Sequence, residues 1–315
     1  MTLTIGVDVG GTKVAGGVVD DAGTVLVQTR RDTPADDVAK TRDVIIDLVG
    51  ELAAGRTIEG VGIGAAGWID ANRSTVLFAP NLAWRDEPLR EYVGKAVGLP
   101  VIVENDANVA AWAEFRYGAA RDADDSMVMF TIGTGVGGGI VLGGELLRGA
   151  HGVAAELGHM LAVPDGHQCG CGRLGCIEQY ASGSALVRFA RAGARQEPQR
   201  ATALLELAGG ETEAITGHMV TTAAQGGDPV STEAFAQIGR WLGTSLADMA
   251  QILDPQTLVV GGGVIDAGDL LLGPARRSYL DALAQRGRLP VAEVLPAELG
   301  NSAGVIGAAD LARRI

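Results

Sequence analysis

A strand–turn–strand pattern occurs twice in this chain and restricts its fold more than any other feature. The segment LTIGVDVGGTKVAGGVV near the start is similar to SMVMFTIGTGVGGGIVL in the middle, because aligning Asp8 with Thr131 also aligns Gly10 with Gly133. Each segment has an apolar strand, a turn of small residues and a second apolar strand. The repeat therefore predicts two similar halves, each with its own sheet.

Strands alternate with helices around these two segments, which is typical of a mostly parallel α/β sheet. Helical spacing of apolar residues, glycine stops and a proline start predict the helices. The predicted additional strands are 58–64, 99–104, 257–261 and 291–297, and the predicted helices are 35–55, 88–98, 105–118 and 302–314, with most of 183–253 also helical.

The size and charge of the chain limit its class. A chain of 315 residues is too long for one compact core, so two domains are expected. The net charge of −13 and the lack of a Lys/Arg block argue against nucleic acid or an anionic membrane as a partner. No signal region or long apolar run is present, and three cysteines within eight positions do not form a disulfide framework. These features favour the cytoplasm.

Three glycine-rich loops each follow a buried strand: DVGGTK (8–13), TIGTGVGGG (131–139) and VGGGV (260–264). Ligands of open α/β sheets bind at such strand ends, and glycine leaves backbone N–H groups accessible to phosphate oxygens. Thr12 and Thr134 add hydroxyl donors. No loop has the P-loop pattern, and none is a proper G-x-G-x-x-G opening a helix. Any one loop alone could be a structural turn, but the three together predict binding of nucleotide phosphates.

Asp8 places a carboxylate at the end of a buried strand. A buried carboxylate needs a partner, and Mg²⁺ carried by ATP phosphates is a suitable one. The alternative is that Asp8 caps its own turn.

Three polar residues, Glu104, Asn105 and Asp106, stand where a strand turns into a helix. Asn and Asp are common helix caps, which is the alternative interpretation. Three such groups exceed the needs of a cap, and the helix dipole would keep a carboxylate there ionised. Such a carboxylate can orient a substrate hydroxyl and accept its proton in phosphoryl transfer.

The segment HMLAVPDGHQCGCGRLGC holds all three cysteines. His159 with Cys169, Cys171 and Cys176 makes a Cys₃His set, which predicts a closed, structural zinc site. His167 is the second candidate for the histidine ligand. The alternative, three reduced cysteines packed as small hydrophobic residues, suits the glycine-rich surroundings poorly.

Two glutamates flank this segment and suggest a sugar site. Glu156 lies three residues before His159, a spacing that places both on one face of a helix. Together with Glu178 they offer acceptors and a donor for sugar hydroxyls. His159 can bind metal through one ring nitrogen and substrate through the other.

These motifs together resemble the ROK family (repressors, open reading frames, kinases), and within it the bacterial glucokinases, over nearly the whole chain. DVGGTK and TIGTGVGGG resemble its two phosphate motifs, LVVGGGV its adenosine-side motif, and ENDANVAAWAE the segment with its catalytic aspartate. ELGH resembles the family's sugar motif. The most specific match is CGCGRLGCIEQYASG, which resembles the family's zinc signature.

The resemblance implies a role for each matching residue. Asp106 would be the general base toward the sugar 6-hydroxyl. The sugar would be held by Gly67, Asn105, Asp106, Glu156, His159 and Glu178; ATP and Mg²⁺ by Asp8, Gly10, Gly11, Thr12, Lys13, Gly133, Thr134, Gly135, Gly262 and Gly263; and structural zinc by His159, Cys169, Cys171 and Cys176.

The resemblance also implies an α/β fold of the actin-like (ribonuclease H-like) ATPase type with two domains that close over substrate. The small domain would comprise residues 1–107 plus 301–315. The large domain, 108–300, would carry the zinc loop and the interface of a homodimer or homotetramer.

The implied function is the ATP-dependent phosphorylation of glucose to glucose 6-phosphate in glycolysis. One alternative is a ROK kinase for N-acetylglucosamine, N-acetylmannosamine, fructose or allose. Another is a sugar-responsive repressor, although the first strand begins by about Leu3 and leaves no room for a helix-turn-helix domain before it. An actin-like structural ATPase would not need Glu156, Glu178 or the zinc loop.

Overall fold

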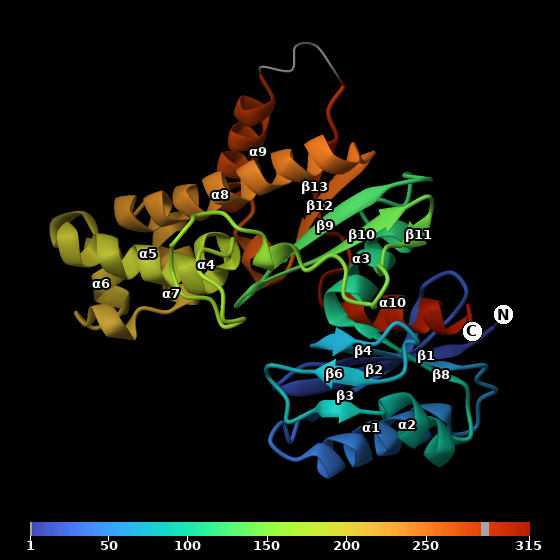
Figure 1. The fold of residues 1–315 in the computed structure, drawn as a ribbon. Helices are drawn as coiled ribbons and strands as arrows, with labels where there is room; N and C mark the ends of the chain where they lie inside the picture. Colours follow the sequence, from blue (N-terminus) through green and yellow to red (C-terminus); the bar gives the residue numbers. More distant parts are fainter. Residues whose placement is uncertain (1, 285–289) are drawn as a thin grey trace. The chain divides into compact units, whose positions relative to one another are not determined.

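The computed structural model of the chain describes residues 2–284 and 290–315 (Figure 1). It forms two compact units. Unit 1 comprises Met1–Met127, Gly138–Ala155 and Glu298–Ile315, and unit 2 comprises Val128–Gly137 and Glu156–Ala297.

A five-stranded sheet forms the centre of unit 1. Its order is β3-β2-β1-β4-β8, in which β1 pairs antiparallel with β2 and parallel with β4, and β4 pairs parallel with β8. The strands are β1 (Thr4–Val9), β2 (Lys13–Val19), β3 (Val25–Asp32), β4 (Val61–Ala65) and β8 (Val101–Asn105).

Helices cover both faces of this sheet (Figure 1). On β2, Val14 and Val18 belong to the same core as Leu48 of α1 (Val38–Ala53), and α2 (Leu89–Val97) lies beside α1. The alternate side chains of β2 point to the opposite face, where Ala15 and Val19 pack against α10 (Ala303–Ala312). Helix α3 (Asp106–Tyr117) packs against α10.

Unit 1 also contains a small antiparallel sheet that the sequence did not predict. Its strands are β5 (Trp68–Ile69), β6 (Val76–Phe78) and β7 (Arg85–Glu87). Strands of two or three residues are too short to show an alternating pattern, which explains why they were missed.

The second five-stranded sheet confirms the predicted repeat. Its order, β11-β10-β9-β12-β13, matches that of the first sheet strand by strand. The alignment of Asp8 with Thr131 places the first and last residues of β1 on those of β9, and of β2 on those of β10. The strands are β9 (Met127–Ile132), β10 (Val136–Leu142), β11 (Glu145–Leu146), β12 (Thr257–Gly261) and β13 (Glu293–Pro296).

The remaining helices belong mostly to unit 2. The region 183–253 is largely helical as predicted, but it is divided at Pro198 and at Gly209–Gly210. The α-helices are α4 (Glu178–Ala181), α5 (Gly183–Gln196), α6 (Thr202–Leu207), α7 (Gly217–Gln225), α8 (Pro229–Leu253) and α9 (Asp269–Leu283); the 3₁₀ turns are η1 (Leu157–His159), η2 (Pro198–Arg200), η3 (Thr212–Ala214), η4 (Gly263–Ala267) and η6 (Gly300–Ser302).

The two compact units differ from the domains expected from the sequence in the grouping of α3 and of residues 138–155, which belong to unit 1. The expected domains, 1–107 plus 301–315 and 108–300, are domains that would close over substrate. Their boundaries stay a prediction.

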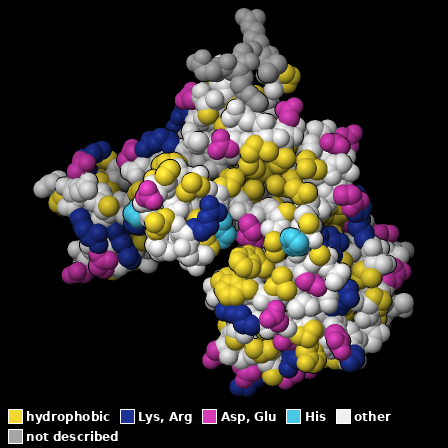
Figure 2. Space-filling model, viewed as in Figure 1, with side chains coloured by type: hydrophobic (Ala, Val, Ile, Leu, Met, Phe, Trp, Pro, Cys, Tyr) yellow, Lys and Arg dark blue, Asp and Glu magenta, His cyan; other side chains and the backbone are white. Residues whose placement is uncertain are grey.

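Basic and acidic side chains are mixed over the face drawn in Figure 2, in keeping with a net charge of −13. No helix within residues 2–284 and 290–315 combines the length and apolar character needed to span a bilayer.

Helix α10 approaches the first sheet so closely that two strand positions must be glycine. A Cβ atom on Gly6 would lie 1.8 Å from the carbonyl oxygen of Val305, and one on Gly62 would lie 1.8 Å from that of Ala308. Backbone atoms do not move aside as a flexible side chain does, so a larger residue would push the helix off the sheet.

We predict that Gly62→Ala destabilises the protein by about 3 kcal/mol, because the new methyl group overlaps the α10 backbone. Gly50→Ala is the matched control: Gly50 lies inside α1, and nothing lies within 4 Å of an added Cβ. It should stabilise by about 1 kcal/mol through helix propensity. Urea unfolding of both variants measures the effects, and equal stabilities would contradict the close packing.

Candidate active site

Asp106 is the first residue of α3, directly after β8. Asn105 caps the helix: its Oδ1 accepts a hydrogen bond from the backbone N–H of Asn108 at 3.0 Å, and its Nδ2 donates to the carbonyl oxygen of Gly67 at 3.0 Å. The structure therefore brings together Gly67, Asn105 and Asp106, three of the predicted sugar-side residues.

The electrostatic environment of Asp106 differs from expectation. Burial raises the pKa of Asp106, and hydrogen bonds from the backbone N–H groups of Ala107 and Asp106 act in the opposite direction. The expectation that the helix dipole keeps this carboxylate ionised considered one effect that favours the charged form, whereas burial, the larger effect, disfavours it. A carboxylate with a raised pKa is a stronger base for a hydroxyl proton.

Asp8 lies on β1, with its backbone paired to Ala15 and Gly64 on the neighbouring strands. Burial raises the pKa of Asp8 to about 6. The negative charge of Asp106 also raises this pKa, and the positive charge of Lys13 lowers it. Two partly buried carboxylates of unit 1 therefore repel each other. A divalent cation with oxygen-preferring chemistry would relieve this repulsion.

The first glycine loop is a tight turn from β1 to β2. The N–H of Gly10 donates to the carbonyl oxygen of Lys13 at 3.0 Å. Thr33 holds the turn from outside, because its Oγ1 donates to the carbonyl oxygen of Gly10 at 2.8 Å and its N–H to that of Thr12 at 3.1 Å. Thr12 and Lys13 are exposed, and Gly11 is partly exposed. Sequence reasoning missed Thr33, since no motif marks it.

The second and third glycine loops meet in unit 2. The N–H of Gly133 donates to the carbonyl oxygen of Gly135 at 3.0 Å, and Ser184 Oγ donates to that of Thr134 at 2.7 Å. Gly262, at φ +85°, follows β12 and lies so close to β9 that a Cβ would be 2.5 Å from the N atom of Ile132.

Both loops line one cavity of about 490 Å³, a volume in the range of small-molecule sites. Gly133, Thr134 and Gly263 contribute to it as predicted residues; Gly135 and Gly262 are not among its lining residues. The lining residues that the sequence analysis did not single out include Gly183, Ser184, His218, Thr221 and Asp266. Gly183 and Ser184 follow the Ser182 cap of α5, which is a recognisable helix start, but nothing in the sequence marks these two residues as lining a cavity.

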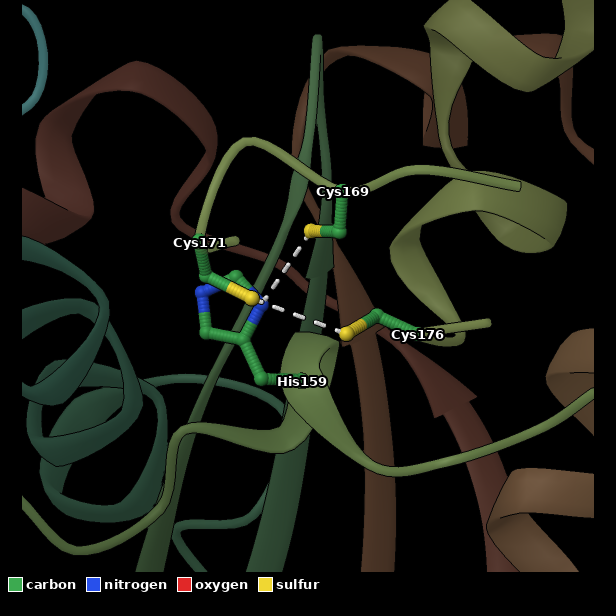
Figure 3. Close-up of side chains that lie close together, drawn as sticks. All are labelled: His159, Cys169, Cys171 and Cys176. Atoms are coloured by element: carbon green, nitrogen blue, oxygen red, sulfur yellow. Dashed lines mark hydrogen bonds between the residues drawn. The ribbon is translucent and has the colours of Figure 1, made fainter. Parts of the chain in front are cut away.

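His159, Cys169, Cys171 and Cys176 form a cluster whose ligand atoms all lie within 4.8 Å of one another. Figure 3 shows the four side chains pointing toward one another. The distance from Cys169 Sγ to His159 Nδ1 is 3.7 Å, and that from Cys171 Sγ to Cys176 Sγ is also 3.7 Å. Ligands of a tetrahedral zinc ion with Zn–S bonds of ~2.3 Å stand roughly 3.8 Å apart, so the cluster fits such an ion.

The other candidate ligand, His167, is not one of these four residues. The backbone N–H of His167 donates to the hydroxyl of Tyr180 at 2.9 Å, and the imidazole ring packs against the ring of Tyr180 with centroids 5.5 Å apart. Burial and the neighbouring Cys171 raise the pKa of Cys176 to about 12, so a metal ion must displace a proton from this thiol when it binds.

The two ring nitrogens of His159 have different surroundings. Nδ1 faces Cys169 in the metal cluster, and Nε2 lies 3.9 Å from the Glu156 carboxylate. Glu156 and His159 are therefore neighbours as predicted, although they lie at a single 3₁₀ turn, η1, and not on an α-helix. The arrangement allows metal binding at one nitrogen and substrate binding at the other.

Glu178 connects the metal cluster to the second glycine loop. Its Oε1 accepts from Cys169 Sγ at 3.5 Å, and its Oε2 accepts from the backbone N–H of Val136 at 3.1 Å. A Cβ on Gly135 would lie 2.3 Å from the same oxygen. Glu178 thus has a supporting role in the protein itself, and its predicted role in sugar binding stays a prediction.

Residues 4–315 match the ROK family. The chain belongs to this family. It is 51% identical over 313 residues to a glucokinase of Streptomyces coelicolor, a match that covers 99% of this chain and 98% of that protein.

Two solved structures agree. A ROK family glucokinase from Streptomyces griseus, in complex with glucose and AMPPNP, is 51% identical and superposes with a TM-score of 0.89 over 99% of this chain and 100% of that one. A ROK hexokinase from Thermus thermophilus is 34% identical with a TM-score of 0.84, over 99% and 98%. The predicted two-domain actin-like fold is confirmed.

The raised pKa of Asp8 predicts that this residue lowers stability at neutral pH. Its folded-state pKa of about 6 exceeds the unfolded value of 3.8, so the native state prefers the protonated form, and stability is lost as the pH rises from 3.8 through 6. Asp8→Asn should therefore stabilise the ligand-free protein by about 2 kcal/mol at pH 8 and by much less near pH 4. Urea unfolding at both pH values tests this; a gain independent of pH would exclude a titration of Asp8 as its cause.

Proposed function

We propose that this protein is an ATP-dependent glucokinase, which converts glucose and ATP to glucose 6-phosphate and ADP. The observation that carries the proposal is 51% identity, over 99% of the chain, to a ROK glucokinase that was crystallised with glucose and an ATP analogue. The site residues of both units fit the chemistry of phosphoryl transfer.

In the proposed reaction the glucose 6-hydroxyl oxygen forms a bond to the γ-phosphorus of ATP, and the bond from that phosphorus to the β–γ bridging oxygen breaks. The hydroxyl proton passes to the carboxylate of Asp106. The raised pKa of Asp106 favours this transfer, and its fixed place at the start of α3 orients the hydroxyl. We propose that Gly67, Asn105, Glu156, His159 and Glu178 bind the remaining sugar atoms.

ATP binding is assigned to the three glycine loops. The cavity lined by Gly133, Thr134 and Gly263 would receive the nucleoside side of ATP, and the exposed residues of the turn at 10–13 would contact phosphates. Asp8 would hold Mg²⁺ on those phosphates, and the ion supplies positive charge that offsets the charge on the phosphate oxygens.

The Cys₃His cluster is assigned to structural zinc. All four positions of a tetrahedral ion would be filled by protein, which leaves none for a reacting water. The ion would fix the conformation of a loop that contains Gly170, Gly172 and Gly175, whose backbones have many accessible conformations.

Use of several hexoses is the second candidate, because the chain is also 34% identical to a ROK hexokinase. Comparison of kcat/KM for glucose, fructose, N-acetylglucosamine, N-acetylmannosamine and allose distinguishes the two.

Since ATP is the proposed donor, we also propose that the protein acts in the cytoplasm. It would form a homodimer or homotetramer, which sedimentation would identify.

We predict that Asp106→Asn lowers kcat for glucose by about 10²- to 10⁴-fold, because the amide cannot accept the hydroxyl proton. Asp47→Asn, at an exposed position on α1, is the matched control and should retain full turnover. Coupled detection of ADP measures both. Near-normal turnover of the Asp106 variant would remove this residue from the mechanism.

We predict that Cys176→Ser reduces bound zinc from about one ion per chain to almost none, because the hydroxyl is a poor replacement for a buried thiolate. His167→Ala should keep its zinc, since His167 lies outside the cluster. Metal analysis of the purified proteins gives both values. Zinc loss in the His167 variant together with retention in the Cys176 variant would reverse the ligand assignment.

A further inference from the structure

Glu104, the residue before Asn105, is 1% exposed, and both oxygens of its side chain have polar contacts. One oxygen, Oε1, accepts from the backbone N–H of Asn105 at 2.9 Å and from Asn108 Nδ2 at 3.1 Å. The other, Oε2, lies 3.0 Å from Arg73 Nε and 2.6 Å from Arg148 Nε. Three of the roughly four acceptor sites of this carboxylate are filled by hydrogen bonds, and Arg148 adds an ion pair without a hydrogen bond from its Nε. Glu104 is therefore engaged by the protein itself on both oxygens.

The two arginines anchor this carboxylate to the segment that follows β5. Arg148 is 11% exposed and donates to the carbonyl oxygens of Asp70 and Ala71, each at 2.9 Å. Arg73 has φ +54°, an unfavourable value for a residue with a side chain, and its carbonyl oxygen accepts from the N–H of Val103 on β8 at 3.0 Å. Two cations beside one buried carboxylate form a rigid, charge-assisted support.

The contacts of Glu104 and Asn105 fix the same turn from two sides. Glu104 holds the Asn105 N–H and the Asn108 side chain, and Asn105 in turn caps the Asn108 N–H and holds Gly67. These hydrogen bonds oppose a shift of the next residue, Asp106, along the helix axis.

We propose that Glu104, held by Arg73 and Arg148, is a positioning residue for the phosphoryl-transfer reaction, because it sets the place and direction of the Asn105–Asp106 turn without touching substrate. This inference rests on the proposed glucokinase activity. Loss of such support moves a catalytic group by a fraction of an ångström to about 1 Å, and displacements of that size cost up to about 100-fold in rate.

The experiment compares Glu104→Gln with Glu87→Gln. The amide keeps the size of the side chain but removes the charge and replaces one acceptor by a donor. Glu87 is the matched control, because it is also buried, at 7% exposed, and also pairs with an arginine, Arg42, at 3.4 Å. This pair joins β7 to α1 and not to α3. Both variants should lose some thermal stability, so stability alone does not separate them.

Steady-state kinetics separates them. For Glu104→Gln we expect kcat to fall about 10- to 100-fold and the KM for glucose to rise, while the KM for ATP stays within about twofold. For Glu87→Gln all three should stay within about twofold of the wild type. A general loss of structure would instead affect the KM for both substrates.

A second variant covers the case in which Glu104→Gln does not fold. Arg148→Lys keeps the charge but cannot reach the carboxylate and the two carbonyl oxygens together. Arg148→Lys should lower kcat about 3- to 10-fold with an unchanged KM for ATP. If Glu104→Gln does not fold, a wild-type kcat in Arg148→Lys would overturn the inference.

Three results overturn part of the account. A folded Glu104→Gln variant with a kcat within twofold of the wild type contradicts the positioning role, as does an equal loss of kcat in Glu87→Gln. Absence of glucose phosphorylation by the wild type contradicts the proposed function itself, so the two failures are distinguishable.

Discussion

The close approach of helix α10 to the first sheet is the constraint on which the position of helix α3 depends. Gly6 and Gly62 let the α10 backbone lie directly on β1 and β4. Asp310 of α10, which is 5% exposed, then accepts hydrogen bonds from Trp112 and Tyr117 of α3. The position of α3, and with it the position of Asp106 at its start, thus follows from two glycines on neighbouring strands.

Buried carboxylates hold α3 along its whole length. Glu104 supports the turn into the helix, and Asp310 bonds its middle and end. Glu114, which is fully buried, accepts from the N–H groups of Ala119, Glu298 and Leu299 near its end. These three carboxylates accept hydrogen bonds from the protein, which offsets the cost of their burial. Asp8 and Asp106 instead have raised pKa values, because burial disfavours their charged forms more than their contacts stabilise them.

The sequence predicted the features that have a local pattern. The duplicated strands, the three glycine loops and the Cys₃His set all depend on spacing within short segments. It did not predict the residues whose partners lie far away in the chain, such as Arg73 and Arg148 beside Glu104 or Thr33 beside the first glycine loop. Spacing along the chain carries no information about such pairs. The raised pKa of Asp106 could not be predicted for a related reason: the helix dipole follows from local structure, whereas burial depends on the tertiary fold.

The metal cluster and the second glycine loop form a continuous structure in unit 2. Glu178 bonds Cys169 through one oxygen and the Val136 N–H through the other, and Gly135 has no side chain that would displace it. A metal ion that bound Cys169 as a thiolate would remove this S–H···O hydrogen bond and place charge beside Glu178, so metal binding would be coupled to Glu178 and, through it, to the turn at 133–136. Since this turn lines the cavity assigned to the nucleotide, an ion with no reacting water can still influence binding of the phosphoryl donor. The same ion would orient His159, whose second nitrogen faces Glu156. One structural metal site would thus organise groups assigned to both substrates.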